Sequence, residues 1–595
     1  MSAVAEGPSI PGQDRPGRFP ATLLTSFAIG FLYGAGPFSR WQAAIESAQV
    51  LAGTVQYPDG NAFYEYHLKA WTLINQALAP WLVLGVTERV LSIALSGLMT
   101  GLTFLSLTLC AYALSRRPLL SLCAPLFTLA LIGSTNQYGV IYPIFIAGTE
   151  HTYGVIGRAM ALTLFATLAL GHRRSGAVLL GIAPAIHPTW GAWSILVATI
   201  ILAWDPKAAL PTARKLLPYF AAGACISALS LAYQLLQSRG LTEVDPESQA
   251  SYLHAFLTHW DFHRRPVDLR SPGVYLGVAT VLLSLLWLTA FRKDNAQEAT
   301  LMYRALLVSG TLGLLGCAAT WIPDRLPDIV NMAMPGRFLN LSIFAMPAVL
   351  LGILGRYQDR LVFKGLLFLH LGYALWNWFF LAILSSDRFG WTLDHWKEWL
   401  ACSLLLIAIR AALPRIKEQP RATRLAQRAF VPALIACLVI LAIGIALSEI
   451  LKRQSLILSA PDAVLDAASR GEGLLITAGA MQFIQLRTRR PLLLNTGALD
   501  QITIVPSSGP EMTRVLDQVY GIDLFNPPED IKRTRPGGLL PDSARALWES
   551  RSTADWQAIA QEFNATQILT HGETQLQLPE IARNDTFALY QIPKD

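Results

Sequence analysis

Over its first 450 residues the chain alternates long apolar segments with short polar ones. A membrane-spanning helix needs about 20 apolar residues, and slightly fewer where neighbouring helices bury it. By this measure the sequence predicts about thirteen spans, at 21–38, 88–115, 118–133, 153–171, 176–189, 191–204, 216–237, 273–291, 301–321, 338–355, 362–384, 396–413 and 429–450. The fifth and sixth are short and are joined at the sequence HPTWG.

The basic residues between these segments predict the orientation of the chain, because Lys and Arg mark cytoplasmic loops. With thirteen spans and a cytoplasmic N-terminus, all of these clusters fall on the cytoplasmic side: Arg15 and Arg18, Arg116–Arg117, His172–Arg174, Lys207 with Arg214–Lys215, Arg292–Lys293, Arg356 with Arg360, and the stretch 414–428. The long loops then lie outside, at 39–87, 134–152 and 238–272, with shorter ones at 322–337 and 385–395. An odd number of spans also places the tail outside.

From Gly471 onward the pattern changes to that of a water-soluble domain. The stretches GLLITAG, RPLLLNTG, TQILTHG and DTFALYQIP are typical of strands, and GPEMTRVLDQVYGI and STADWQAIAQEFNA of amphipathic helices. Strands that alternate with helices predict a small α/β layer domain. The fold class expected is therefore an α-helical polytopic membrane protein with an extracytoplasmic α/β domain, divided into a cytoplasmic tail (1–20), a membrane domain (21–450) and an external domain (451–595).

Composition agrees with many spans and argues against nucleic-acid binding. Of the 595 residues 53% are hydrophobic and only 15% are charged, where soluble proteins carry about 25%. The net charge of +7 comes from basic residues between apolar segments, where they set topology. The six cysteines lie in or beside apolar segments without a CxxC pair, so neither a disulfide framework nor a zinc site is expected. No GxGxxG or P-loop opens a helix of the tail.

The first external loop contains an unusual patch of acids and aromatic residues, GTVQYPDGNAFYEYHLKAWTLINQ, at 53–76. Asp59 or Glu65 could deprotonate a hydroxyl next to the membrane surface, with His67 beside them. Rings such as Tyr64 suit stacking on sugar faces. The alternative is that the aromatic residues only form an interfacial belt on an amphipathic helix.

The second loop and the broken fifth span supply further candidates. Glu150, His151 and Arg158 lie close to a span end, where ionisable residues are costly unless they are paired or functional. The alternative for this set is a buried ion pair between Glu150 and Arg158. His187 and Trp190 lie where Pro184, Pro188 and Gly191 interrupt the helix, which predicts the wall of a cavity or a structural hydrogen bond.

The third loop, HAFLTHWDFHRRPVDLR, brings three histidines near two arginines. The spacing of His254, His259 and His263 fits no zinc signature, so we expect no metal site. Arg264 and Arg265 suit a phosphate or pyrophosphate, because a guanidinium donates two parallel hydrogen bonds; the alternative is a solvated, salt-bridged loop. Arg337, in MPGRFLNLS, could hold a lipid-linked phosphate or reach ordinary headgroups.

In layout the chain resembles the GT-C superfamily of membrane glycosyltransferases. The resemblance rests on about thirteen spans, the long loop 39–87 and the α/β tail 451–595, whose ending WQAIAQEFNATQILTHG is similar to the ends of several bacterial members. It implies transfer of a sugar from a polyprenyl-phosphate donor to a glycan, lipid or protein acceptor at the outer face of the bacterial cytoplasmic membrane. The family usually has an acid soon after the first span, where this chain has Ser39-Arg40-Trp41-Gln42. No DxD occurs there, which disfavours the metal-dependent variant, and no cofactor is expected.

This departure leaves open which residue is the base. It is Glu46, Asp59, Glu65 or Glu150, or the chain keeps the fold without the reaction. Three other functions compete with glycosyl transfer: an O-antigen-type polymerase or ligase, a transporter and a non-catalytic scaffold. The folded tail argues against the polymerase or ligase, and the scarcity of charges within the spans argues against the transporter.

Overall fold

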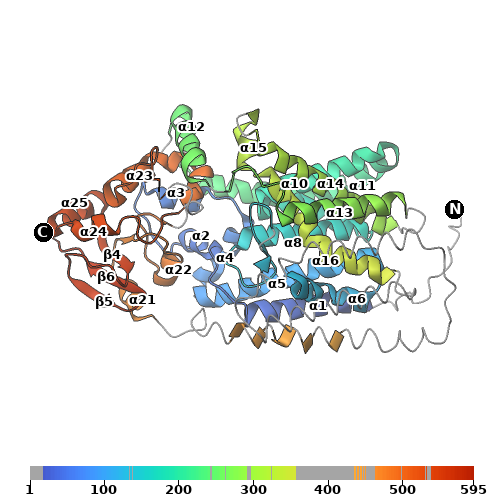
Figure 1. The fold of residues 1–595 in the computed structure, drawn as a ribbon, viewed down its shortest axis with the longest axis horizontal. Helices are drawn as coiled ribbons and strands as arrows, with labels where there is room; N and C mark the ends of the chain where they lie inside the picture. Colours follow the sequence, from blue (N-terminus) through green and yellow to red (C-terminus); the bar gives the residue numbers. More distant parts are fainter. Residues whose placement is uncertain are drawn as a thin grey trace.

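The computed structural model describes residues 18–356, part of 435–450, and 462–594. Within these ranges, residues 133–134, 137–138, 242–243, 262, 291–296, 323–324, 497–498, 530 and 532–537 are not described. The spans expected at 362–384 and 396–413 lie outside the described residues, as does part of 429–450. Figure 1 shows an elongated molecule with a helical bundle along most of its length and a mixed α/β domain at one end.

The bundle consists of helices that run roughly along the long axis (Figure 1). They are α1 (Arg18–Ala35), α5 (Glu88–Ser115), α6 (Pro118–Leu122), α7 (Ala124–Ile132), α8 (Thr152–Ala169), α9 (Arg173–Ile186), α10 (Pro188–Trp204), α11 (Pro206–Gln237), α13 (Pro272–Thr289), α14 (Gln297–Ala319) and α16 (Leu339–Arg356).

Shorter elements come from the loops that the sequence places outside. The first loop forms α2 (Ala44–Leu51), α3 (Ala62–Lys69) and α4 (Leu73–Val83), and the second forms the two-residue strands β1 (Thr135–Asn136) and β2 (Ile144–Phe145). Later loops form α12 (Pro246–Ala255), the π-helical turn η1 (Phe256–Trp260), α15 (Asp328–Met332) and the 3₁₀ turn η4 (Pro335–Phe338).

Among the residues that the structure describes, six helices are long and apolar enough to cross a membrane: Glu88–Ser115, Thr152–Ala169, Leu210–Gln237, Pro272–Thr289, Gln297–Ala319 and Pro335–Arg356. Phe19–Ala35, Leu73–Val83, Pro118–Leu129 and Pro188–Trp204 are shorter apolar helices. The described residues therefore do not confirm the expected count of about thirteen spans. One cause is local: the span expected at 118–133 is divided at Cys123 into α6 and α7.

Small residues bring α1 and α5 into close contact. A Cβ atom on Gly34 would lie 2.3 Å from the carbonyl oxygen of Ser96, and one on Gly30 would lie 2.8 Å from that of Thr100. Deeper in the same interface the hydroxyl groups of Ser26 and Thr108 lie 2.7 Å apart. This arrangement is typical of membrane helices, where packing depends on small residues and interhelical hydrogen bonds.

The C-terminal domain is built on a four-stranded mixed sheet with the strand order β3-β4-β6-β5. Strand β3 (Leu474–Thr477) is parallel to β4 (Ala565–His571), while β6 (Phe587–Gln591) is antiparallel to both β4 and β5 (Glu580–Arg583). The strands expected from GLLITAG, TQILTHG and DTFALYQIP are confirmed. The stretch RPLLLNTG is not a strand and makes one isolated bridge, between Leu492 and Leu475.

Helical elements complete this domain. They are α21 (Ala463–Ala468), α22 (Ile484–Thr488), η6 (Leu499–Thr503), η7 (Pro506–Ser508), α23 (Gly509–Val515), η8 (Leu516–Tyr520), α24 (Arg545–Ser550) and α25 (Thr553–Phe563). The amphipathic segments GPEMTRVLDQVYGI and STADWQAIAQEFNA form α23–η8 and α25, as expected.

One hydrophobic core joins the C-terminal domain to the loops of the membrane domain. Phe63 of α3 and Phe256 and Trp260 of η1 are buried in the same cluster as the strands and helices of the C-terminal domain. The indole N–H of Trp260 donates a 2.8 Å hydrogen bond to the carbonyl of Leu524. The domain is therefore packed onto the first and third external loops rather than attached by its linker alone.

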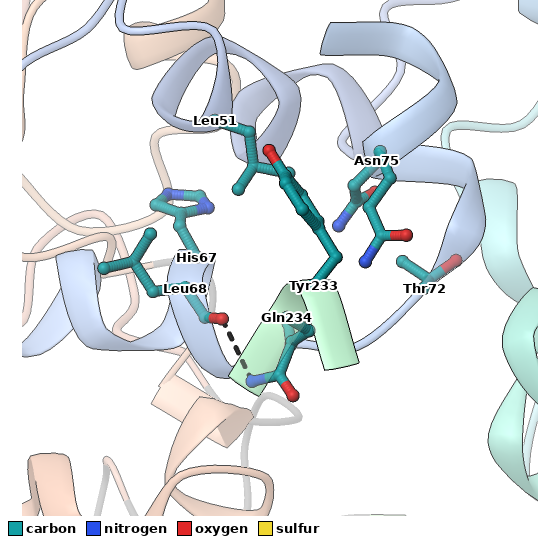
Figure 2. Close-up of a pocket in the computed structure, with 9 residues that line it drawn as sticks. Leu51, His67, Leu68, Thr72, Asn75, Tyr233 and Gln234 are labelled. Carbon is teal, nitrogen blue, oxygen red and sulfur yellow. Dashed lines mark hydrogen bonds between the residues drawn. The ribbon is translucent and has the colours of Figure 1, made fainter. Parts of the chain in front are cut away.

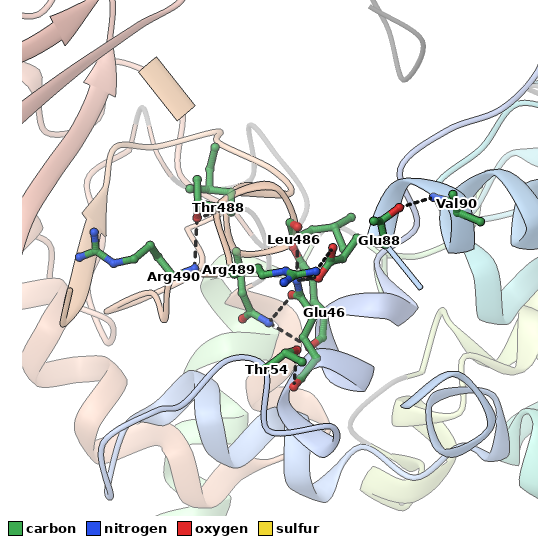
Figure 3. Close-up of polar contacts among 12 residues, drawn as sticks. Glu46, Thr54, Glu88, Val90, Leu486, Thr488, Arg489 and Arg490 are labelled. Atoms are coloured by element: carbon green, nitrogen blue, oxygen red, sulfur yellow. Dashed lines mark hydrogen bonds and ion pairs between the residues drawn. The ribbon is translucent and has the colours of Figure 1, made fainter. Parts of the chain in front are cut away.

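Polar contacts beside this core fix α22 on α2 and on the start of α5 (Figure 3). Arg489 donates to both carboxylate oxygens of Glu88, at 2.7 and 2.9 Å. Gln485 donates to the backbone carbonyl of Glu46 at 2.9 Å and to the side chain of Gln49 at 3.2 Å, and it accepts from the hydroxyl of Tyr57 at 2.6 Å. A buried amide with partners on both its oxygen and its nitrogen specifies one docking position.

Replacing Gln485 tests this docking. We expect Gln485→Ala to destabilise the association of the two domains by about 1–3 kcal/mol, because Tyr57 and the Glu46 carbonyl lose their buried partner. Thermal unfolding in detergent and the rate of limited proteolysis between the domains would measure it. The control is Gln518→Ala, at an exposed position of the same domain. Equal behaviour of the two variants would contradict a role for Gln485 in docking.

Candidate functional site

The segment after α1, where the resemblance implies an acid, is used to hold the second loop. Gln42 is fully buried, and its amide nitrogen donates to the carbonyl of Thr149 at 2.8 Å. Its oxygen accepts from the hydroxyl of Thr152 at 2.8 Å. These two bonds clamp the turn that contains Glu150 and His151. Gln42 is therefore not itself an acid, but it positions Glu150, an acid of the neighbouring loop.

A second clamp holds the other end of this loop. The side chain of Asn340, at the start of α16, accepts from the backbone N–H of Val140 at 2.7 Å and donates to its carbonyl at 3.0 Å. Between the clamps, Ile141 has a φ of 67°, a conformation that is rare for a β-branched residue. Backbone strain of this kind is found where the surrounding structure fixes a side chain at a functional site. The side chain that follows is Tyr142.

Tyr142 contacts charged and imidazole groups from three segments of the chain. Its hydroxyl is hydrogen-bonded to Nδ1 of His151, and the ring of His263 lies 5.6 Å from its ring. The guanidinium of Arg337, on η4, lies 4.9 Å above the ring centroid, a cation–π distance. We call Arg40, Tyr142, Glu150, His151, His263, Arg337 and Asp500 the junction cluster, because they lie where the bundle meets the C-terminal domain.

Arg337 is the central charge of this cluster. Its Nε atom is buried and has no hydrogen-bond partner, and no carboxylate among the described residues lies within ion-pair distance of its guanidinium. Its charge nevertheless acts on His151, His187 and His263. A half-buried guanidinium without a carboxylate partner is the arrangement expected of a site that binds an anion.

Arg264 differs from Arg337 because its bonds are used within the protein. It pairs with the buried carboxylate of Asp261 and donates to the carbonyls of Asn331 and Met332, at 3.2 and 3.3 Å. It thereby ties the third loop to the segment just before η4. Arg265 lies in the same turn. Of the two arginines predicted to hold phosphate, Arg264 therefore uses its guanidinium in bonds within the protein.

The C-terminal domain contributes Asp500, which the sequence analysis did not single out. Its side chain is exposed, although the next three residues of η6 are buried. Burial nevertheless raises the pKa of Asp500 to about 6, while the charges of Arg264 and Arg337 lower it. Because the charges of Arg264 and Arg337 act on it, Asp500 lies on the side of the C-terminal domain that meets the bundle.

The electrostatics of the junction cluster keep its histidines neutral. Burial, reinforced by the charge of Arg337, lowers the pKa of His151 and of His263 to about 4. Burial raises the pKa of Glu150, and the charge of Arg40 opposes that shift. At neutral pH, His151 and His263 are therefore hydrogen-bonding groups and not cations, and Arg337 carries the positive charge that faces Asp500.

The acid and aromatic patch at 53–76 lies against the C-terminal domain, and its Tyr66 is within reach of the charge of Asp500. Glu65 is buried and pairs with Lys69 at 3.0 Å, and it accepts from the hydroxyl of Ser507 at 3.1 Å. Asp59 is exposed in the turn before α3. Tyr64 stacks on Tyr57, with ring centroids 5.7 Å apart. These contacts are those of a docking surface, and they do not bring Asp59 or Glu65 to Arg337.

His67 lies at a small recess between α3, α4 and α11 (Figure 2). Its Nδ1 atom lies 2.9 Å from the hydroxyl of Ser47, and burial lowers its pKa to about 3. Across the recess are Asn75, which accepts from Tyr153 at 2.7 Å, and Gln234, which donates to the carbonyl of Leu68 at 3.2 Å. The recess belongs to the packing of the first loop on α11.

Glu46 is buried between α2 and α22, with one carboxylate oxygen that has no hydrogen-bond partner. Burial raises its pKa to about 8, against a hydrogen bond from the backbone of Leu486 that lowers it. At neutral pH its carboxyl group is therefore mainly protonated. A buried, protonated acid is poorly suited to take a proton from a hydroxyl that arrives from solvent.

The remaining predicted residues line the bundle beneath the junction. Arg158 donates to the carbonyl of Phe145 at 2.6 Å and lies 4.6 Å from the ring of Phe344, so it does not form the buried ion pair with Glu150 that was the alternative. His187 caps α10 by accepting from the backbone N–H of Trp190 at 3.5 Å. Trp190 packs against Phe338, one residue after Arg337.

No grouping of three or more His, Cys, Asp or Glu side chains that could hold a metal ion occurs in the described part of the chain.

Comparison with known proteins gives a distant structural likeness. No family model matches the sequence, and no curated protein matches it either. Among solved structures, the chain is similar to the crystal structure of ArnT from Cupriavidus metallidurans bound to undecaprenyl phosphate, with 13% sequence identity, 97% of each chain covered and a TM-score of 0.46. A likeness at this level is too distant to place individual residues.

The state of Glu46 can be tested through stability. Its pKa of about 8 in the folded protein lies above the ordinary value of 4.5 for a glutamate. Stability is therefore lost as pH rises between these values, because only the unfolded state releases the proton. Glu46→Gln cannot ionise. We expect its stability relative to the wild type to rise by about 1.4 kcal/mol per pH unit in that window.

Thermal unfolding in detergent from pH 5 to 9 would measure this difference. Glu562→Gln, at an exposed position, is the matched control and should show no such trend. A Glu46→Gln difference that stays constant with pH would mean that Glu46 is ionised in the folded protein.

Proposed function

We propose that this protein is an integral membrane glycosyltransferase that moves a sugar from a polyprenyl-phosphate donor to an acceptor. The single observation that carries the proposal is Arg337, a half-buried guanidinium with an unpaired Nε atom and no carboxylate partner among the described residues. It begins one of the candidate spans, Pro335–Arg356. A phosphate attached to a membrane-embedded chain would arrive at this depth.

Two further features of the junction favour an anion. Helix α8 begins here, with His151 at its N-cap, and the first N–H groups of a helix attract negative charge. His151 and His263 are held as neutral imidazoles, which can donate one hydrogen bond each without the cost of a second buried cation. Together with Arg337 they form a set of donors for phosphate oxygens.

The proposed chemistry uses this charge in the transition state. When the acceptor hydroxyl attacks the anomeric carbon, the bond between that carbon and the phosphate oxygen breaks. The electron pair of that bond goes to the phosphate, and the guanidinium of Arg337 stabilises the charge that develops there. Preorganised donors of this kind supply much of the rate enhancement of enzymes. The attacking hydroxyl loses its proton to a carboxylate.

The remaining parts of the proposal follow from the sequence. The reaction would take place at the outer face of the bacterial cytoplasmic membrane, with the C-terminal domain in the periplasm and the N-terminus in the cytoplasm. The acceptor would be a glycan, a lipid or a protein in the assembly of cell-surface glycans. The six candidate spans and the domain packed on the external loops are compatible with this placement.

Removing Arg337 tests the phosphate site. We expect Arg337→Ala to weaken binding of undecaprenyl phosphate by about 10- to 100-fold, since a charge-assisted hydrogen bond contributes about 1.5–3 kcal/mol. Binding to purified protein in nanodiscs, followed by thermal stabilisation over a range of ligand concentrations, would measure it. Arg337→Lys keeps the charge without the forked geometry and should be intermediate.

Arg270→Ala is the matched control, because this arginine is exposed on the same loop side of the bundle. It should bind as the wild type does. If Arg337→Ala also binds undecaprenyl phosphate as tightly as the wild type, the phosphate lies elsewhere. If the wild type binds no polyprenyl phosphate, glycosyl transfer from such a donor is wrong.

A further inference from the structure

Glycosyl transfer by this route needs a group that accepts the proton of the attacking hydroxyl, and the structure narrows the choice. Four acids of the external side are unsuited by their contacts. Glu46 is buried and protonated at neutral pH, Glu65 is paired with Lys69, and Asp261 is paired with Arg264. Asp59 is exposed in the turn before α3, and the carboxylates whose charges act on Arg337 are those of Asp500 and Asp261. Two acids remain in the junction cluster, Glu150 and Asp500.

Glu150 is held by the bundle and faces a different arginine. Its turn is clamped by Gln42, and the charge that acts on it comes from Arg40. Arg40 in turn pairs with Glu449 at 3.3 Å. Glu150 therefore belongs to a chain of fixed charges on the α1 side of the junction. These contacts stabilise the second loop, and they suit a structural role of Glu150 better than the role of a base.

The charge of Asp500 acts on Arg337, the arginine that would hold the phosphate. It lies on η6, whose buried Leu499 and Ile502 belong to the same core as Phe256 and Trp260 of η1. The hydroxyl of Thr503 donates to its carbonyl at 2.7 Å, which fixes the turn. Its carboxylate is exposed, and no described side chain forms an ion pair or hydrogen bond with it. It is thus fixed in position and accessible.

The charged and titratable groups around Asp500 come from four elements. Arg337 and Arg264 lower its pKa, and Asp261 raises it. Tyr142 and Tyr66 are also within reach of its charge. Burial raises the pKa of Asp500 more than the two arginines lower it, and the result is a pKa of about 6. The carboxylate is therefore ionised at neutral pH and is a better proton acceptor than an ordinary aspartate.

We propose that Asp500, supplied by the C-terminal domain, is the general base of the transfer that the preceding subsection proposes. Its carboxylate takes the proton from the acceptor hydroxyl as that oxygen bonds to the anomeric carbon. The bond from this carbon to the phosphate oxygen breaks, and its electron pair leaves with the phosphate held by Arg337.

Asp500→Asn tests this assignment, because it keeps the shape and removes the base. The probes are undecaprenyl phosphate for binding and, for turnover, whichever of a panel of undecaprenyl-phosphate sugars the wild type consumes in lipid extract. We expect unchanged binding of undecaprenyl phosphate and a fall of about 10²- to 10⁴-fold in donor consumption. The rise of the wild-type rate with pH, with an apparent pKa near 6, should disappear.

Three other variants make the result specific. Asp517→Asn, at an exposed position of the same domain, should leave both readouts unchanged. Asp500→Glu keeps a carboxylate and should recover part of the activity, which a merely structural role of Asp500 would not predict. Glu150→Gln should lower turnover by less than Asp500→Asn does.

Several outcomes would overturn the assignment. Turnover of Asp500→Asn within a few-fold of the wild type would do so, as would a joint loss of binding and turnover, which would make Asp500 part of the phosphate site. A larger fall in Glu150→Gln would assign the base to the bundle, and glycosyl transfer itself would stand. A wild type that neither binds undecaprenyl phosphate nor consumes any donor would remove the proposed function and this inference together.

Discussion

The structure depends most on the hydrophobic core that the C-terminal domain shares with the external loops. Phe63 and the η1 residues Phe256 and Trp260 are all but fully buried in it. Burying side chains of this size contributes about 1.5–3 kcal/mol each, which is enough to hold two folded units together against their independent motion. Within the junction cluster, Asp500 lies on η6, whose Leu499 and Ile502 belong to this core, and His263 follows η1. The contribution of the C-terminal domain to the cluster therefore depends on docking.

Three buried amide side chains fix the orientation of the parts that the core holds together. Gln42, Asn340 and Gln485 each use both their oxygen and their nitrogen, and together they fix the second loop at two points and α22 at a third. An apolar contact tolerates sliding, whereas a buried amide that slips loses its partners and carries the full desolvation cost. This is why a loop with a strained residue, Ile141, can still present Tyr142 to Arg337 in one orientation.

Much of this organisation could be predicted from the sequence, and the part that could not has a physical reason. Strands β3, β4 and β6 and helix α25 follow from local patterning, whereas β5 is an edge strand, EIAR, whose mostly exposed residues give no hydrophobic signal. Glu150, His151, His263 and Arg337 stood out because ionisable residues near span ends are costly. Asp500 did not, because an aspartate in a water-soluble domain costs nothing until tertiary packing places it beside the membrane domain.

The same distinction explains the surroundings of two acids of the first loop. Glu65 lies four residues before Lys69 on α3, a spacing that favours an ion pair along a helix, and the docked domain then adds Ser507 to that pair. Glu46 lies on the face of α2 that the domain covers. Docking therefore removes acids from solvent on one side of the interface and supplies Asp500 on the other. Arg337 on the bundle and Asp500 on the docked domain therefore carry opposite charges on two separate parts of the protein, and docking brings these charges within reach of each other.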